Sequence, residues 1–290
     1  MQLQGVSVIK STVALSAGQR FIDVGMLNAP MEVVGVFERA VNLDAGGEIF
    51  SILSADAGRS QSAVVVENAG GLGLRIGDTL NTIPGQIQSR DVRVCIDLSH
   101  TTVWNGRIDC SFKQTLSPES VSALKAITQR HSPFADAQNS CYDGPLSQAV
   151  ATLRSAPTDA VRALAGLGRG LTPSGDDILL GFTTVLNHFH ADDECLSSFH
   201  NEIASSLHAT TALSAQLLKN ALKYEYHEYI EDMLIALSGA PEAVGPAATR
   251  LLRMGASSGA DIAAGMLYAA EWILRGLRLL STFNSQLSTQ

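Results

Sequence analysis

An eight-residue pattern, Ser-Gly-x-Asp-Ile-x-x-Gly, occurs twice in the chain, at 174–181 and at 258–265. Each copy is typical of a helix start, because serine is a preferred N-cap residue, an aspartate falls in the first turn and apolar residues follow at helical spacing. Two such starts can face one another around a pocket. The repeat therefore predicts where the chemistry lies, with Asp176, Asp177 and Asp261 as the candidate catalytic residues.

These acidic side chains are compatible with three roles. They can cap the helix and compensate its dipole. They can hold a divalent cation such as Mg²⁺, with Asp176 and Asp177 as oxygen ligands, and the cation would bridge to a phosphate. They can also bind an amide or amine N–H of a substrate. Capping can explain the repeat without any ligand, although the return of the same acid as Asp261 favours a site. The sequence indicates no other cofactor.

A glycine-rich loop, Gly166-Leu-Gly-Arg-Gly-Leu-Thr-Pro, precedes the first copy alone. Such a loop can expose several backbone N–H groups to an anion, and the helix dipole adds about half a positive charge at the same end. It is not a dinucleotide-binding fingerprint, because the segment 159–165 before it is helix-like and that fingerprint follows a strand. We therefore take the first copy as the stronger site element and the second as its pseudo-symmetric support.

Other catalytic patterns find little support in the sequence. Four histidines, His188, His190, His200 and His208, crowd one stretch, but they form no His-Glu-x-x-His zinc motif and ordinary surface histidines explain them. No Gly-x-Ser-x-Gly nucleophile elbow includes Ser174. The four cysteines, Cys95, Cys110, Cys141 and Cys195, are widely spaced, so we assign none of them a catalytic role and expect a reducing cytoplasm.

Length and charge limit the class of protein. The 290 residues, of which 46% are hydrophobic, are enough for two domains with sizeable cores. A formal charge of −8 argues against nucleic acid or an anionic membrane as a partner. The longest apolar segment, 260–280, contains four charged residues, which argues against a membrane span, and the first ten residues resemble no secretory signal. We expect a soluble protein that binds small molecules or other proteins.

Hydrophobic periodicity changes along the chain. Between Gly5 and Phe112, short β-type runs, the first of them at 6–9, alternate with clusters of Gly, Asn and Asp. After Pro118 the period becomes helical, with helices expected near 120–129 and 146–153 and then from 158 to 280 with short breaks. The sequence predicts an α+β protein. A mostly antiparallel β domain, sheet or small barrel, covers 1–115 and a mostly α-helical domain covers 116–290.

The motif and its loop, 166–181, closely resemble the signature of the family of the AllH-type subunit of oxamate carbamoyltransferase. The resemblance extends to Val36-Phe-Glu-Arg-Ala-Val-Asn-Leu43, to Thr210-Thr-Ala-Leu-Ser214 and to Gly255-Ala-Ser-Ser-Gly-Ala-Asp261. It implies an enzyme subunit of purine or allantoin catabolism that acts with other carbamoyltransferase subunits. Its expected substrates are small anions: oxalurate and phosphate are interconverted with oxamate and carbamoyl phosphate.

The resemblance also implies roles for particular residues. Asp176 or Asp177 would accept the amide proton or place Mg²⁺. Phosphate and substrate carboxylate would be bound by residues of the loop, of both repeats and of two other segments: Gly168, Arg169, Gly170, Thr172, Ser174, Gly175, Ser258, Gly259, Thr211 and Arg39. The alternative is a non-catalytic subunit that binds a phosphorylated metabolite or docks partners. A phosphotransferase is a third hypothesis, but no P-loop or kinase signature supports it.

Overall fold

The structure, a computed structural model, describes residues 9–25, 30–106, 108, 114–133, 144–189 and 193–287, the last with side chains to 277. The chain forms two compact units, 1–107 and 108–290, which we describe separately. Most of the predicted β-run at 6–9, together with His190, Cys110 and Cys141, lies outside the described residues.

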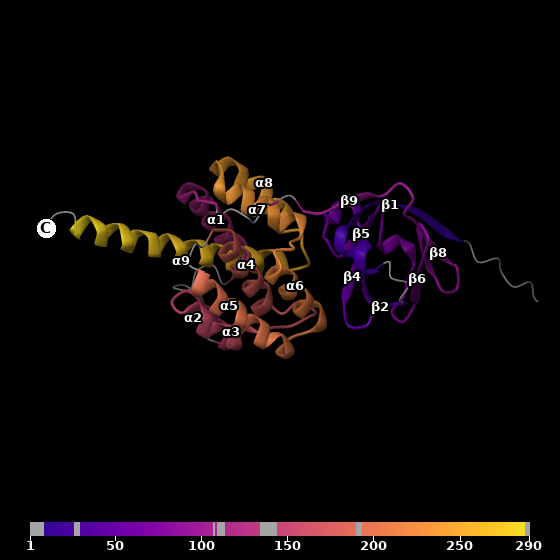
Figure 1. Ribbon diagram of the computed structural model, residues 1–290, viewed down its shortest axis with the longest axis horizontal. Helices are drawn as coiled ribbons and strands as arrows, with labels where there is room; N and C mark the ends of the chain where they lie inside the picture. Colours follow the sequence, from indigo (N-terminus) through magenta and orange to yellow (C-terminus); the bar gives the residue numbers. More distant parts are fainter. Residues whose placement is uncertain are drawn as a thin grey trace, which may run out of the picture. The chain divides into compact units, whose positions relative to one another are not determined.

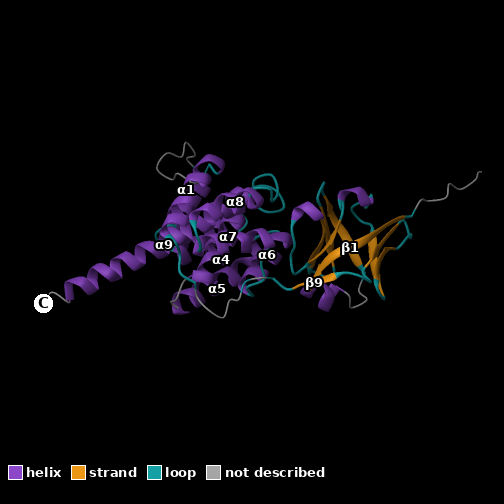
Figure 2. Ribbon diagram, turned by 90° about the horizontal axis from the view of Figure 1, so that it is seen from above, coloured by secondary structure: helices purple, strands orange, loops and turns teal. Residues whose placement is uncertain are grey.

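The first unit is a closed β-barrel (Figures 1 and 2). Strand order around it is β1-β5-β4-β3-β2-β6-β7-β8, and β8 returns to β1; β9 continues the sheet on the same side of β1 as β8. Three pairings, β1 with β8, β1 with β9 and β4 with β5, are parallel and the others are antiparallel. The strands are β1 (Lys10–Gly18), β2 (Met31–Val36), β3 (Ala40–Asp44), β4 (Ile49–Ser54), β5 (Ala63–Val66), β6 (Thr79–Ile83), β7 (Gln86–Ser89), β8 (Val94–Asp97) and β9 (Thr102–Trp104).

Strand β1 closes the barrel because it is long enough to pair twice. Its first half, from Lys10 to Val13, pairs with β8, and its second half, from Ala14 to Ala17, pairs with β5. Alternating side chains then fill the interior, as along β2, where Met31 and Val33 are fully buried. The prediction of a mostly antiparallel sheet or small barrel is confirmed, and the long-range pairing of β1 makes it a barrel. Three short helical turns interrupt the strands: η1 (Phe21–Gly25), η2 (Ala55–Ala57) and η3 (Gly70–Leu72).

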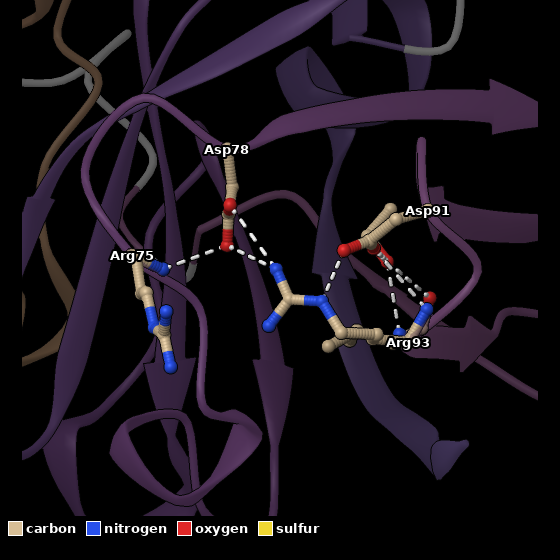
Figure 3. A network of polar contacts seen from close by, with 6 residues as sticks. Arg75, Asp78, Asp91 and Arg93 are labelled. Atoms are coloured by element: carbon tan, nitrogen blue, oxygen red, sulfur yellow. Dashed lines mark hydrogen bonds and ion pairs between the residues drawn. The ribbon is translucent and has the colours of Figure 1, made fainter. Parts of the chain in front are cut away.

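A network of hydrogen bonds and ion pairs connects the turn before β6 to the turn before β8 (Figure 3). The Arg93 guanidinium donates from Nη2 to both carboxylate oxygens of Asp78 at 3.2 Å and from Nε to Asp91, while the Arg75 N–H donates to Asp78 at 2.8 Å. The hydrogen bond from Arg93, with one from Ser89, lowers the pKa of Asp91 to about 2. All these groups are paired within the barrel surface, so we read the network as structural.

The second unit is helical (Figure 2). Helix α4 lies at its centre, since all its residues from Gly175 to Phe189 are buried. The most extensive contact between two elements of the described chain is that of α4 with α9. The helices are α1 (Pro118–His131), α2 (Pro145–Leu153), α3 (Pro157–Leu164), α4 (Ser174–Phe189), α5 (Asp193–Ser206), α6 (Ala212–Leu222), α7 (Glu228–Ser238), α8 (Val244–Leu251) and α9 (Ser258–Leu287), with short turns η4 (Leu207–Ala209) and η5 (Pro241–Ala243).

The helical prediction is confirmed, with one difference in α4. Its spacing predicts one apolar face, whereas the opposite face is buried as well. Its polar side chains there bond within the protein: Thr183 Oγ1 donates to the Leu179 carbonyl at 2.7 Å and Asn187 Nδ2 to the Ala221 carbonyl at 2.8 Å. Buried polar groups are tolerated when they are hydrogen-bonded. Among the described residues, no helix is both long and apolar enough to cross a membrane.

Candidate functional site at the starts of α4 and α9

The two copies of the motif fold into equivalent helix starts. In the first, the Gly175 N–H donates to the Leu167 carbonyl at 2.8 Å. In the second, the Gly259 N–H donates to the Met254 carbonyl at 2.9 Å. The N–H groups of the two motif aspartates likewise donate to the residue just before each serine. The sequence repeat is therefore a structural repeat.

A physical requirement fixes the glycine that follows each serine. A Cβ atom at Gly175 would overlap the carbonyl oxygen of Leu164, which ends α3, and one at Gly259 would overlap that of Leu251, which ends α8. Each long helix thus begins directly against the end of the helix before it. Close packing accounts for both glycines without a ligand.

The last glycine of each copy lies where the two helices cross. A Cβ at Gly181 of α4 would overlap the carbonyl oxygen of Ile262 in α9, and a Cβ at Gly265 of α9 would overlap that of Ile178 in α4. The contact is reciprocal, since each glycine meets the isoleucine of the other copy. The repeat is therefore a pseudo-two-fold crossing, and it brings the two helix starts together.

At this crossing each aspartate is held by the other copy. Asp177 accepts a side-chain hydrogen bond from Ser258, and Asp261 accepts one from Ser174. Thr172 also contacts Asp177, and its Oγ1 lies 2.8 Å from Ser258 Oγ. We did not predict from the sequence that the serine of each copy bonds the aspartate of the other. The recurrence of Ser and Asp at the same spacing was the signal that could have indicated this pairing.

Asp177 and Asp261 form a buried pair of carboxyl groups, which we call the acid pair. Each is 2% exposed. The Oδ2 atom of each is buried and has no hydrogen-bond partner among the described residues. A buried polar atom left unpaired costs about 1–3 kcal/mol, more if it is charged. An unpaired oxygen in both acids therefore points to a ligand that supplies hydrogen-bond donors.

Burial also changes the protonation of the acid pair. The pKa of Asp177 is raised to about 8, mainly by loss of solvation and also by the charges of Asp261 and Asp176, against the opposing hydrogen bonds from Ser258 and Thr172. Loss of solvation raises the pKa of Asp261 to about 6. Because the two acids interact, the first proton leaves chiefly from Asp261 and the second chiefly from Asp177 as the pH rises. Near pH 7 the pair holds one proton.

Asp177→Asn is expected to stabilise the protein at neutral and alkaline pH. The pKa of Asp177 is raised on folding, so its favourable contribution is complete below about pH 4 and is lost as the pH rises to about 8. An amide of the same shape removes this loss, and the expected gain is on the order of a few kcal/mol at pH 8. Urea unfolding at pH 4.5 and pH 8 measures it. A difference between variant and parent that does not grow with pH would contradict the assignment.

Asp176 is turned away from the acid pair. Its Oδ1 accepts the Gly166 N–H at 2.8 Å, and its Oδ2 accepts a hydrogen bond from the Thr210 hydroxyl. Both oxygens therefore connect α4 to the loop before it and to the segment before α6. The predicted catalytic or Mg²⁺-binding role of Asp176 stays a prediction, and it would require one of these bonds to be given up.

The glycine-rich loop is open to solvent between Gly168 and Leu171. Gly168 and Gly170 have positive φ angles, 138° and 91°, which other residues rarely adopt. In the described part of the chain, the N–H groups of Gly168, Arg169 and Gly170 have no protein acceptor. They can therefore face an anion. The Gly175 N–H is donated to the Leu167 carbonyl, so its predicted phosphate contact, which stays a prediction, would require that bond to be given up.

Two further predicted residues have contacts of their own within the protein. Thr211 caps α6, since its hydroxyl accepts the Ser214 N–H at 3.1 Å, and it also donates to the Leu171 carbonyl of the glycine-rich loop. Arg39 belongs to the barrel, where its Nη1 lies 3.9 Å from Asp56 Oδ2. Their predicted substrate contacts stay predictions.

Among the described residues, no three His, Cys, Asp or Glu side chains are grouped closely enough to hold a metal ion. The histidine stretch has other contacts: His200 Nε2 lies 2.6 Å from Asn187 Oδ1, and His208 Nδ1 lies 2.8 Å from the Ser205 carbonyl. His188 is buried beside Phe189. These contacts fit structural roles for all three, and the expectation of surface histidines is wrong for His188, which is buried.

The fold and the site define a class: a two-unit α+β protein in which two equivalent helix starts cross and enclose a pair of buried acids. Residues 164–270 match the family model described as oxamate carbamoyltransferase subunit AllH, a range that begins at the end of α3 and includes the loop and both motif copies. Over this region, which is less than half of the chain, the protein is similar to the family of oxamate carbamoyltransferase subunit AllH. No solved structure matches the chain.

Proposed function

We propose that this chain supplies the substrate site of a carbamoyltransferase that interconverts oxalurate and phosphate with oxamate and carbamoyl phosphate. In the forward direction a phosphate oxygen attacks the terminal carbamoyl carbon of oxalurate. The bond from that carbon to the inner nitrogen breaks, and the nitrogen takes a proton to become the amide of oxamate. The family supports the reaction, and the unpaired oxygens of the buried acid pair carry the proposal of where it takes place.

The two parts of the site suit the two ends of such substrates. The exposed loop offers the N–H groups of Gly168 and Gly170 and the side chain of Arg169 to a phosphate or carboxylate. Arginine and backbone N–H groups are the common donors to these anions. The acid pair would repel a bare anion, but it can accept N–H groups. The anionic end would therefore lie at the loop and the nitrogen-bearing end at the acid pair.

Asp177 is the candidate for proton exchange with the inner nitrogen. A carboxyl group whose pKa lies near 8 is protonated at neutral pH and can release its proton in the transition state. In the reverse direction the carboxylate would take the proton from the amide of oxamate. Because an amide is a poor nucleophile, a positioned base is useful there. The site would thus serve both directions with one group.

Reconstitution with the partner subunits tests the proposal. Carbamoyl phosphate formed from oxalurate and phosphate would be measured with and without this chain. Arg169→Gln is expected to raise the KM for phosphate by about tenfold with little change in kcat, because it removes one contact shared by ground and transition states. Arg162→Gln, whose parent residue pairs with Glu202 on the surface, is the control. Equal KM values for Arg169→Gln and the parent would place the anion elsewhere.

A non-catalytic binding subunit is the second candidate, favoured by the nearly complete burial of the acids. Calorimetry on the isolated chain with phosphate and carbamoyl phosphate, with and without Mg²⁺, separates the two. Binding in the absence of turnover, even when partner subunits are present, would support the binding subunit. Turnover that depends on Asp177 would exclude it.

A further inference from the structure

The second motif copy offers a group that takes no part in the proton exchange of the proposed reaction, the carboxyl of Asp261. It is as deeply buried as Asp177, and its Oδ2 likewise has no partner in the part of the chain described. Its position is set by Ser174 from the first copy. Capping of α9 does not require this arrangement, because the carboxyl is directed across the crossing and not back onto its own helix start.

The arrangement of the two acids at the helix crossing indicates which chemical group a ligand would need. Asp177 and Asp261 come from helices related by a pseudo-two-fold, and they are close enough for the charge of Asp261 to raise the pKa of Asp177. Two neighbouring acceptor oxygens suit two neighbouring N–H donors. A ureido group has two nitrogens on one carbon and presents such a pair, whereas phosphate, carboxylate and methyl groups offer no N–H.

Resting on the proposed function, we propose that Asp261 determines specificity for the carbamoyl group by accepting a hydrogen bond from its terminal NH₂, while Asp177 faces the inner nitrogen that is carbamoylated. The second copy of the motif would then contribute a residue that contacts the substrate. Ser174 and Ser258 are positioning residues, since each orients the acid of the other copy.

The energetic reason for selectivity is the cost of an unpaired buried acceptor. An acetyl group has the shape of a carbamoyl group but carries CH₃ where the latter carries NH₂. Bound at this site, it would bury the Asp261 oxygen against a methyl. Sites built to hydrogen-bond a substrate group reject the analogue that lacks it by about 10⁴-fold. The substitution Asp261→Leu would remove this penalty.

Competing acyl donors test the proposal in the reconstituted complex. Transfer to oxamate would be followed with carbamoyl phosphate and with acetyl phosphate, and the ratio of the two kcat/KM values is the readout. We expect a ratio on the order of 10⁴ for the parent and below about 10² for Asp261→Leu. Asp261→Asn keeps an acceptor oxygen of the same shape, and we expect it to retain most of the discrimination.

The outcomes are distinct. A parent complex that transfers carbamoyl groups, with an Asp261→Leu ratio unchanged within about twofold, overturns the specificity role and leaves the proposed function standing. A parent complex without any transfer overturns the proposed function itself. If Asp261→Leu fails to fold, as judged by thermal unfolding, Asp261→Asn and Ser174→Ala provide the comparison: a drop in the ratio for Ser174→Ala with normal unfolding supports the positioning of Asp261, and no drop overturns it.

Discussion

Asp177→Asn in the reconstituted enzyme is expected to lower the rate of carbamoyl transfer by about 10²- to 10⁴-fold, the usual contribution of a positioned acid or base. Asparagine preserves the shape of the side chain and its bond from Ser258, but it cannot exchange a proton. The loss should therefore appear in kcat, with KM for oxalurate little changed. Steady-state assays in both directions measure it.

The pH dependence of the carbamoyl-transfer rate tests the role of Asp177 independently. For cleavage of oxalurate, Asp177 must be protonated, so the rate falls as the pH rises through about 8. The ionised carboxylate of Asp261 accepts an N–H more strongly than the protonated acid does, so the rate falls as the pH drops through about 6. A maximum near pH 7 results, and Asp177→Asn should lose the alkaline limb.

A matched control for Asp177 is Asp159→Asn, because Asp159 is an exposed acid in α3 of the same unit. We expect it to leave the rate and the pH profile unchanged. Asp177→Asn with more than half of the parent activity would remove Asp177 from the chemistry. The stability gain expected for the same substitution at pH 8 shows that a loss of activity is not a loss of folding.

The second large effect is expected at the helix crossing. Gly181→Ala would place a methyl group against the backbone carbonyl of Ile262, and a backbone atom cannot turn aside as a flexible side chain can. Helices α4 and α9 would have to separate and would lose the most extensive contact of the described chain. We expect destabilisation of about 3 kcal/mol or more, at the upper end for overpacked cores.

Gly276→Ala serves as the control on the same helix. A Cβ at Gly276 meets nothing within 4 Å, so the substitution should stabilise α9 by up to about 1 kcal/mol through helix propensity. Urea unfolding of both variants makes the comparison. Equal and small effects at the two positions would show that the helices do not cross at Gly181. Because the acid pair depends on the crossing, Gly181→Ala should also reduce activity.

Several features of the candidate site were predictable from the sequence because they depend on local signals. Serine and aspartate at a helix start, a change of hydrophobic period after Pro118 and a glycine-rich approach to Ser174 each act over a few residues. They predicted the α+β organisation, the helices and the exposed loop. The repeat of the motif also indicated a relation between Asp177 and Asp261.

The different contacts of the two neighbouring acids, Asp176 and Asp177, were not predictable from such local signals. Asp176 and Asp177 are adjacent, and successive residues on a helix point about 100° apart. Only the packing of α4 decides that Asp176 bonds to Gly166 and Thr210 while Asp177 meets the second copy. The internal donation of the Gly175 N–H is likewise a result of the chain turning back on α3.

By itself, therefore, the sequence determined the two halves of the protein, the two helix starts and the residue types gathered there. The tertiary structure decided that the starts cross, that the serine of each copy holds the acid of the other and that two carboxyl oxygens stay buried without a partner. It also decided that β1 closes the barrel. The physical reason is the same in each case: capping and periodicity act between near neighbours, whereas burial and pKa depend on segments that are distant in the chain.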